Sequence, residues 1–364
     1  MCGNLTLSMQ NCSGGNCSSK NDTLEGDCYH STLALVLPIV YSVIAFLAIT
    51  GNFSLIFIII KKKEMHNVTN ILIANLSTCD LLISIICLPF TVVYTLMDYW
   101  IFGEAMCKLT NMVQCVSVSV SVFTLVLIAL ERYQLIINPR GWRPSNLHAF
   151  IGIFVVWILA ICIAIPLAIH VVFEESPLNN FPQYKGTFIC HERWPSLSSQ
   201  NIFTNVMLVV QYFGPLCFIG MCYLKIYIRL KRRNVAMETM RENKYRSNET
   251  KRINVLLISI VVATAVCWLP LHIFNIVAEL IPAESMVCTN LWSSVCHLMA
   301  MISTCINPIF YGFLNRNLQQ DLLIAFRFCR CSSREDDYET ITMSTIQSDV
   351  SKTSFKLSSP EASA

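Results

Sequence analysis

Seven long stretches of the chain carry almost no charge, and polar segments separate them. Each stretch is long enough for a helix that crosses a membrane, which needs about 20 apolar residues. Backbone groups in lipid must bond within their own segment, and the ten-residue alternation of a membrane β-barrel is absent. The pattern therefore predicts an all-α membrane protein, a seven-transmembrane helix bundle over residues 33–314. Its predicted spans are Leu33–Ile60, Ile71–Met97, Leu109–Leu130, Leu147–Phe173, Asn201–Leu224, Ile253–Ala278 and Met286–Leu314.

The composition and the placement of charge agree with this prediction. Hydrophobic residues make up 54% of the chain and charged residues only 13%, whereas soluble domains have about 25% charged residues. Four of the 26 Lys and Arg residues lie on the side of the N-terminus, and the rest lie on the other side. Because cytoplasmic loops carry an excess of Lys and Arg, we expect a multi-pass plasma membrane protein with an extracellular N-terminus.

The two ends of the chain differ from the spans. Residues 1–32 form a polar segment with four Asn-x-Ser/Thr sequons, which predicts an extracellular glycosylated tail. Residues 315–328 repeat apolar positions at helical spacing, as in an amphipathic helix on the membrane surface. Residues 329–364 are rich in Ser, Thr and acids, which predicts a disordered cytoplasmic tail. The sequons are at Asn4, Asn11, Asn16 and Asn21.

Cysteines on the two sides of the membrane are expected to undergo different modifications. Seven lie on the predicted outer side, where disulfides form. We predict one bridge between Cys107 and Cys190 and a second between Cys28 and Cys288. Near the inner surface, Cys329 and Cys331 directly follow the predicted amphipathic helix. Cysteines at this position are candidates for palmitoylation, and free cytosolic thiols are the alternative.

Asp80 is the only acidic residue well inside a predicted span. A charge at the membrane centre costs about 2.5–3.5 kcal/mol, so the carboxylate needs partners or a function. Four oxygen-bearing side chains can reach it if the helices pack side by side: Asn52, Ser121, Ser303 and Asn307. Two interpretations stay open, a pocket for an allosteric Na⁺ ion or a proton, and a structural hydrogen-bonded network. We expect no other metal and no organic cofactor.

Short motifs occur in a fixed order, one or two in each predicted helix. Together they resemble the rhodopsin-like G-protein-coupled receptors. The motifs are Asn52, Asn75-Leu76 with Asp80, Trp100-x-Phe102-Gly103, Glu131-Arg132-Tyr133, Trp157, Pro215 with Tyr223, Cys267-Trp268-Leu269-Pro270 and Asn307-Pro308-Ile309-Phe310-Tyr311.

Longer blocks over roughly residues 28–357 resemble the neuropeptide Y receptor family, and its type 1 subfamily in particular. This resemblance implies a receptor for amidated peptides that end in Arg-Tyr: neuropeptide Y, peptide YY and pancreatic polypeptide. It also implies signalling through inhibitory G proteins, which lowers cyclic AMP. A receptor for another amidated Arg-ending neuropeptide is the alternative. The blocks begin at Asn67, Tyr94, Leu135, Gln211 and Met301.

The resemblance also implies a ligand site. Glu279, at the outer end of the sixth helix, is expected to bind the ligand's arginine, since Arg favours carboxylates. His272 is expected at the pocket floor. The alternative for an in-span Gln is a bond to a neighbouring helix, and for Glu279 an ordinary solvated charge. The positions facing the amidated end are Gln114, Gln211, Asn275 and His297, and those of the outer wall are Tyr94, Asp98, Phe274 and Glu192.

On the inner side, the resemblance gives Arg132 the role of contacting the G protein after release from Glu131. As an alternative, Arg132 snorkels to lipid phosphates. Many relatives have a second acid eighteen residues before Trp268, where this chain has Thr250. The other residues expected in activation or coupling are Tyr133, Tyr223, Trp268, Pro270, Asn307, Pro308 and Tyr311.

The sequence lacks the residues that several other classes of membrane protein require. An aspartyl membrane protease needs two intramembrane acids, His191-Glu192 lacks the second His of a zinc motif, and no Gly-x-Ser nucleophile occurs, so we expect no enzyme. Gln114 stands where amine receptors place an aspartate. The expected partners are the amidated peptide, an inhibitory G protein, arrestin after phosphorylation of the tail, and membrane lipid, with no nucleic acid.

Overall fold

The computed structural model describes residues 33–97, 99–176, 185–236, 241–280 and 289–314. The side chains at several helix ends, including that of Glu279, fall outside this description. Several predictions concern residues outside it as well. They are the site residue Asp98, the pair Cys28 and Cys288, the sequons at Asn4, Asn11, Asn16 and Asn21, the helix over residues 315–328, and the tail with Cys329 and Cys331.

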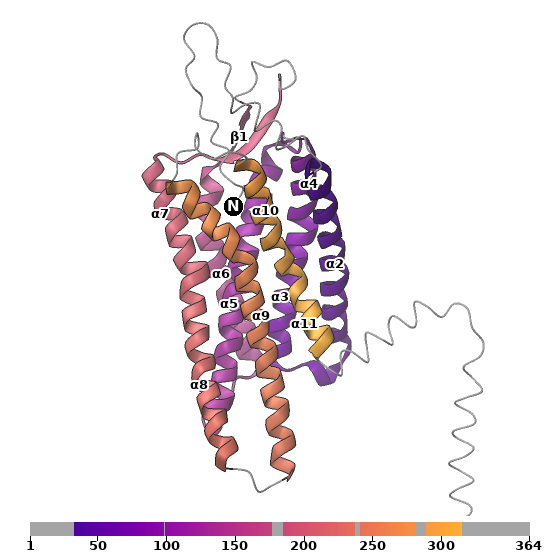
Figure 1. Cartoon of the computed structure of the whole chain (residues 1–364), viewed down its shortest axis with the longest axis vertical. Coiled ribbons are helices and arrows are strands. Elements are labelled where there is room, and N and C mark those ends of the chain that lie inside the picture. The colour runs from indigo at the N-terminus through magenta and orange to yellow at the C-terminus, as the bar shows by residue number, and fades with distance from the viewer. Residues whose placement is uncertain (1–32, 98, 177–184, 237–240, 281–288, 315–364) are drawn as a thin grey trace, which may run out of the picture. The chain divides into compact units, whose positions relative to one another are not determined.

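The described residues contain seven helical segments that are long and apolar enough to cross a membrane. They run side by side in one bundle (Figure 1), which confirms the predicted fold class. We call its two ends the Cys107 end and the Arg132 end, after two residues of the helix α5. The segments are α2 (Leu33–Lys61), α3–η2–α4 (Val68–Leu82, Ile83–Cys87 and Leu88–Met97), α5 (Gly103–Ile137), α6 (Asn146–His170), α7–η4–α8 (Leu197–Leu208, Val209–Phe213 and Gly214–Ala236), α9 (Arg241–Leu280) and α10–η6–α11 (Thr289–Ile302, Ser303–Cys305 and Ile306–Leu314).

Most helices continue past the apolar runs that predict them, because backbone hydrogen bonding does not stop where the side chains become polar. One predicted boundary is wrong in the other direction. The expected span Leu147–Phe173 ends as a helix at His170, and strand β1 (Val171–Glu175) pairs antiparallel with β2 (Phe188–Glu192). A short apolar run suits a strand as well as a helix, so hydropathy alone does not place this boundary.

Three of the spans contain a turn that departs from α-helical geometry shortly before a proline. The π-helical turns η2 and η4 precede Pro89 and Pro215, and the 3₁₀ turn η6 precedes Pro308. A proline ring clashes with the carbonyl four residues earlier, and in each span that carbonyl lies inside the altered turn. These three prolines therefore account for the irregular turns, whereas Pro38, Pro166 and Pro270 lie inside continuous α-helices.

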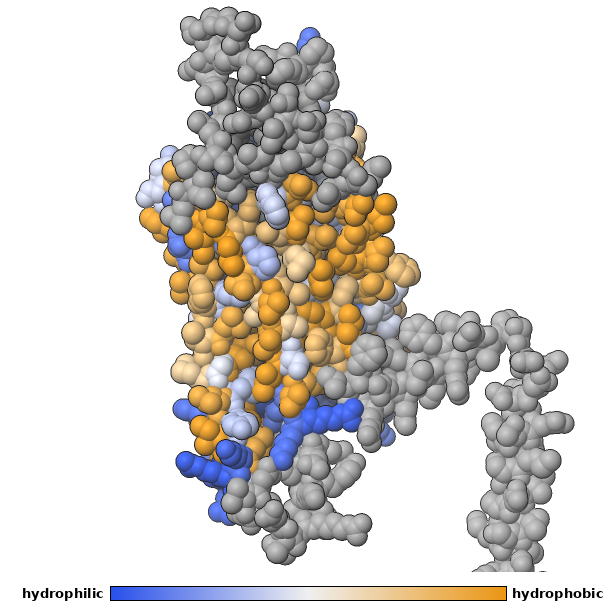
Figure 2. Space-filling view, in the orientation of Figure 1, coloured by the Kyte–Doolittle hydropathy of each residue, from blue (hydrophilic) through white to orange (hydrophobic). Residues whose placement is uncertain are grey.

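The outside of the bundle is apolar over its middle. Large side chains such as Phe46 and Phe154 are exposed there, as expected of a lipid-facing surface. Figure 2 shows this apolar band on the described part of the chain, with a hydrophilic patch at the Arg132 end. The last turns of α8, which reach this end, carry the exposed residues Arg229, Lys231 and Arg232. Inside, α5 packs against α3, α6 and α8 and so forms the centre of the bundle. Helix α5 therefore carries candidate residues toward both ends.

Candidate functional site

A disulfide fixes the hairpin β1–β2 at the Cys107 end. Cys107 on α5 is bonded to Cys190 on β2, with their Cα atoms 5.7 Å apart, which confirms the predicted pairing. The backbone nitrogen of Trp100 also donates to Phe188 O at 2.7 Å. Glu192, the last residue of β2, accepts a hydrogen bond from Trp194 Nε1 at 3.0 Å. The hairpin, which connects α6 to α7, is therefore held at two points to α5 and to the segment that precedes α5.

An aromatic cluster lies where α4 and α5 meet this hairpin. Gly103 begins α5 with φ at +76°, a conformation that favours glycine, and its carbonyl accepts from Trp100 Nε1 at 2.8 Å. The ring centroids of Tyr94 and Trp100 are 6.1 Å apart. Tyr94, predicted on the outer wall, is half-buried on α4 next to this cluster.

A chain of hydrogen bonds crosses three helices close to the Cys107 end. Gln114 on α5 and His297 on α10 meet through their Nε2 atoms at 3.0 Å. His297 Nδ1 lies 2.9 Å from the hydroxyl of Tyr41 on α2, and that hydroxyl donates to Ser294 O at 2.9 Å. Gln114 and His297 are thus brought together. Tyr41 was not predicted, although a tyrosine within an apolar span signals a hydroxyl that needs a partner.

Three further predicted pocket residues, Gln211, Phe274 and Asn275, lie in η4 and on α9. Gln211 Nε2, in the π turn η4, donates to Ser119 Oγ on α5 at 2.6 Å. Phe274 on α9 is buried and Asn275 is half-buried. Gln211 therefore contacts α5 at Ser119 and at Cys115, whose Sγ lies 4.0 Å from Gln211 Nε2, and not at Gln114 itself.

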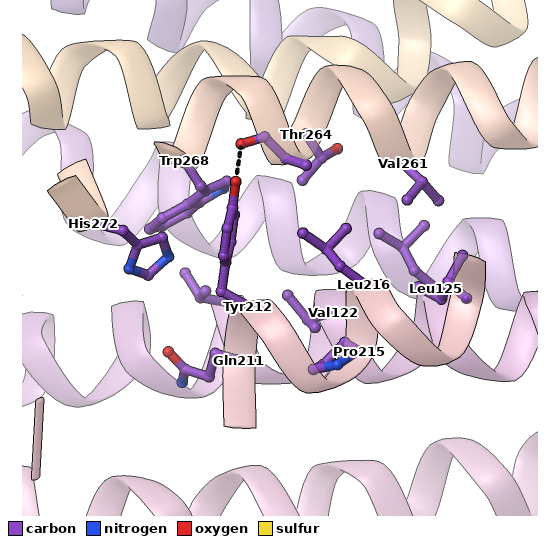
Figure 3. Close-up of a pocket in the computed structure, with 13 residues that line it drawn as sticks. Val122, Leu125, Gln211, Tyr212, Pro215, Leu216, Val261, Thr264, Trp268 and His272 are labelled. Atoms are coloured by element: carbon purple, nitrogen blue, oxygen red, sulfur yellow. Dashed lines mark hydrogen bonds between the residues drawn. The ribbon is translucent and has the colours of Figure 1, made fainter. Parts of the chain in front are cut away.

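A cleft between α5, α8 and α9 contains the predicted floor residue His272 (Figure 3). The rings of His272 and Tyr212 have centroids 4.6 Å apart, and the Tyr212 hydroxyl donates to Ala265 O at 3.0 Å. Trp268 also lines this cleft, and most of its other walls are apolar. The bond from Tyr212 joins η4 to α9 near Pro270, one of the residues expected in activation.

Asp80 lies near the middle of the bundle, and one of its four predicted partners bonds to it. Asn307 Nδ2 donates to Asp80 Oδ2 at 2.8 Å. Ser303 Oγ instead accepts from Trp268 Nε1 at 3.2 Å, and Ser121 Oγ is buried. Both open interpretations of Asp80 therefore remain.

Asn52, the fourth predicted partner, has a different contact. Its Nδ2 donates to Thr304 O at 2.8 Å, and Thr304 is four residues before Pro308. Because the proline supplies no N–H, Asn52 satisfies a carbonyl that the helix leaves free. A Cβ on Gly51 would lie 2.8 Å from Pro308 Cβ, so only glycine permits this close approach.

Arg132 is enclosed at the opposite end of α5. Its Nε lies 3.1 Å from Glu131 Oε2, and its Nη2 donates to Thr69 Oγ1 on α3. Thr69 Oγ1 in turn donates to Glu131 Oε1 at 2.9 Å. We call these three residues the Arg132 triad. Tyr223 and Tyr311 are buried, and Lys225 Nζ lies 5.8 Å from the ring centroid of Tyr133.

Thr69 was not predicted as a member of this site, because a threonine just before the predicted span Ile71–Met97 gives no sequence signal of its partner. Thr250, at the position where an acid was sought, is half-buried on α9. The described carboxylate that pairs with Arg132 is therefore its own neighbour, Glu131.

Comparison with known proteins identifies the family. The model of the 7 transmembrane receptor (rhodopsin family) matches residues 51–311. The chain belongs to this rhodopsin family. It is 56% identical to neuropeptide Y receptor type 1 of Xenopus laevis over 91% of each chain. It is 51% identical to the type 6 receptor of Mus musculus over 89% of each chain, and 43% identical to the type 4 receptor of Rattus norvegicus over 88% of this chain and 86% of that receptor.

Within the rhodopsin family, the chain therefore belongs to the neuropeptide Y receptors. This is a class of multi-pass plasma membrane receptors and not of enzymes. The matched region contains the triad at the Arg132 end and, of the hydrogen-bonded chain at the Cys107 end, Gln114 and His297. The two ends of one rhodopsin-family bundle thus carry two separate polar constellations.

Proposed function

We propose that this receptor is activated by C-terminally amidated peptides of the neuropeptide Y family and signals through inhibitory G proteins to lower cyclic AMP. The observation that carries the proposal is its likeness to neuropeptide Y receptors of types 1, 6 and 4 over nearly the whole chain. The Cys107 end is the ligand side and faces the cell exterior together with the N-terminus. The excess of Lys and Arg on the other side supports this orientation.

The chemistry of the Cys107 end suits an uncharged peptide terminus. Gln114, His297 and Gln211 are neutral hydrogen-bonding groups, and no ion pair joins them to a described carboxylate. An amide offers both donors and an acceptor to such groups. Asn275 and His272 lie on α9, and His272 lines the same cleft as Gln211. Glu279 binds the arginine that precedes the terminal residue.

The outer part of the peptide contacts the rim of the same end. Tyr94 is half-buried beside the aromatic cluster, Glu192 ends the strand β2, and Phe274 is on α9. Asp98 follows Tyr94 by four residues and completes this rim. The acids of the rim attract the basic peptide as well as contact it.

The Arg132 end is the G-protein side. Release of Arg132 from Glu131 and Thr69 frees the guanidinium for the G protein. Tyr133 follows Arg132 on the same helix, and the buried Tyr223 and Tyr311 support the open state. The movement uses Trp268 and Pro270 in α9 and Asn307 and Pro308 in α11. The peptide shifts this equilibrium only by its difference in affinity for the two states.

Several further assignments go with the proposal. The sequons at residues 4–21 carry glycans, Cys329 and Cys331 carry palmitate, and the phosphorylated tail binds arrestin. The exposed basic side chains of Arg229, Lys231 and Arg232 on α8 lie against anionic lipid. Asp80, with Asn307, Asn52, Ser121 and Ser303 around it, holds Na⁺ in the resting receptor, a weak allosteric ligand and not a cofactor.

The test is inhibition of cyclic AMP formation in cells that express the chain. Neuropeptide Y, peptide YY and pancreatic polypeptide are titrated, each as the amide and as the free acid, with and without a toxin that uncouples inhibitory G proteins. We expect toxin-sensitive inhibition by the amides, and the order of potency gives the preferred peptide. Silence with all six peptides, at verified surface expression, contradicts the proposal. Activation by a different amidated Arg-ending peptide alone would favour the alternative.

A further inference from the structure

The hydroxyl of Tyr41 sets the direction of the hydrogen bonds between α2, α10 and α5. Tyr41 is 1% exposed, and its hydroxyl has one proton. Ser294 O, 2.9 Å away, is a carbonyl oxygen and can only accept, so the tyrosine proton goes to it. The oxygen of Tyr41 is therefore an acceptor toward His297 Nδ1, at 2.9 Å.

This requirement selects one tautomer of His297. Nδ1 must carry a proton to donate to Tyr41, and in a neutral imidazole the other nitrogen then has only a lone pair. No ion pair joins His297 to a described carboxylate that would hold it as a cation. His297 Nε2 is thus an acceptor.

The tautomer in turn orients the amide of Gln114. The contact between Gln114 Nε2 and His297 Nε2 at 3.0 Å is satisfied when the amide nitrogen donates. The amide oxygen Oε1 must then point away from His297. No described donor reaches this oxygen, yet it is not sealed in the bundle as the unpartnered oxygens of Asn111 and Asn307 are. Gln114 therefore presents an accessible acceptor.

We propose that Tyr41 is a positioning residue that makes the receptor select amidated over free-acid peptide ends. It acts through His297 and need not touch the peptide: it keeps Gln114 Oε1 turned toward the ligand side. This inference rests on the proposed function and names the residue that decides between the two forms of its ligand. Tyr41 has an unexpected place for such a role, since it is on α2 and faces the interior of the bundle.

The selectivity follows from the donors of the two peptide ends. A C-terminal primary amide has two N–H groups and can donate to Gln114 Oε1. An ionised carboxylate has no donor, so its oxygens face another acceptor across the same contact. Leaving such polar groups unpaired in a desolvated site costs more than the bond is worth in water.

The test compares the affinities of amidated and free-acid neuropeptide Y for the full-length receptor and for Tyr41→Phe. Phenylalanine keeps the ring and removes the acceptor, so His297 is free to protonate Nε2 and Gln114 to turn its amide nitrogen outward. We expect the ratio of free-acid to amide dissociation constants to fall about tenfold, the value of one hydrogen bond. The matched control is Ser42→Ala, because the Ser42 hydroxyl donates within its own helix to Pro38 O at 2.8 Å. This control is expected to leave the ratio unchanged.

A second measurement does not depend on how the variant folds. Nitrogen NMR of the wild-type receptor with labelled histidine, assigned with His297→Gln, is expected to report a proton on Nδ1 of His297. Protonation of Nε2 instead overturns the inference. An unchanged ratio in Tyr41→Phe also overturns it and leaves the proposed function intact. A wild-type receptor that binds neither form of the peptide overturns both.

Discussion

Both ends of α5 carry polar side chains within an apolar bundle, but these side chains are paired differently at the two ends. At the Arg132 end, a cation, an anion and a hydroxyl close on one another: Arg132, Glu131 and Thr69 are joined in a ring of contacts. At the Cys107 end, the groups are neutral, and the chain from Tyr41 to Gln114 ends in an oxygen that no described donor reaches.

The difference indicates how each end works. A paired, partly buried charge is costly to separate, so the triad stays closed until a partner replaces its contacts. The neutral hydrogen-bonded side chains at the Cys107 end leave one acceptor accessible, so a ligand can bind there without rearrangement. Signalling thus requires the contacts of the Arg132 end to break, whereas the Cys107 end only has to bind a ligand.

The largest expected effect comes from removing Arg132 from the triad. Arg132→Ala is expected to remove the cyclic AMP response while peptide binding remains, because the cation that meets the G protein is lost. Arg140→Ala, which removes an exposed arginine from the loop after α5, is the control and is expected to keep the response. A full response from Arg132→Ala would show that the triad does not couple the receptor.

The next largest effect tests whether the charge of Glu279 contributes to peptide binding at the Cys107 end. Glu279→Ala is expected to weaken peptide binding by about 2–5 kcal/mol, the cost of truncating one partner of a desolvated charge pair. Saturation binding measures it. Glu104→Ala is the control, since Glu104 is exposed and pairs with Lys108 at 2.6 Å. Equal affinities of the Glu279 variant and the wild type would remove Glu279 from the site.

A smaller effect concerns the hydroxyl that completes the triad. Thr69→Ala leaves Arg132 with Glu131 alone, so basal signalling without peptide is expected to rise about fivefold, the worth of one hydrogen bond of about 1 kcal/mol. Thr78→Ala on the same helix is the control, because Thr78 donates only to Ala74 O, at 2.8 Å. A basal signal as low as that of the control would mean that Thr69 does not hold the closed state.

An effect of the same size is expected between the two ends, at Asp80. If Asp80 holds Na⁺ in the resting state, replacing Na⁺ with a large organic cation raises peptide affinity about fivefold, and Asp80→Asn abolishes this dependence. The measurement is peptide binding in the two salts at equal ionic strength. A wild-type affinity that ignores the cation would favour the structural network around Asn307.

The sequence predicts the bundle well because the membrane requires long apolar helices, and hydropathy records them. It predicts less of the sites. The rotation of each helix about its axis decides which of the four oxygen-bearing residues contacts Asp80, and a hydropathy pattern does not give this rotation. Asn52, for example, donates to the carbonyl of Thr304 instead. Tyr41 and Thr69 were missed for the same reason, since each acts on a residue of a different helix.

The most direct test of the account is competition binding to the purified full-length receptor, without G protein, by neuropeptide Y as the amide and as the free acid. The account predicts that the amide displaces a labelled family peptide and that the free acid needs a much higher concentration. Equal affinities for the two forms, or no binding of either by a folded receptor, would contradict it.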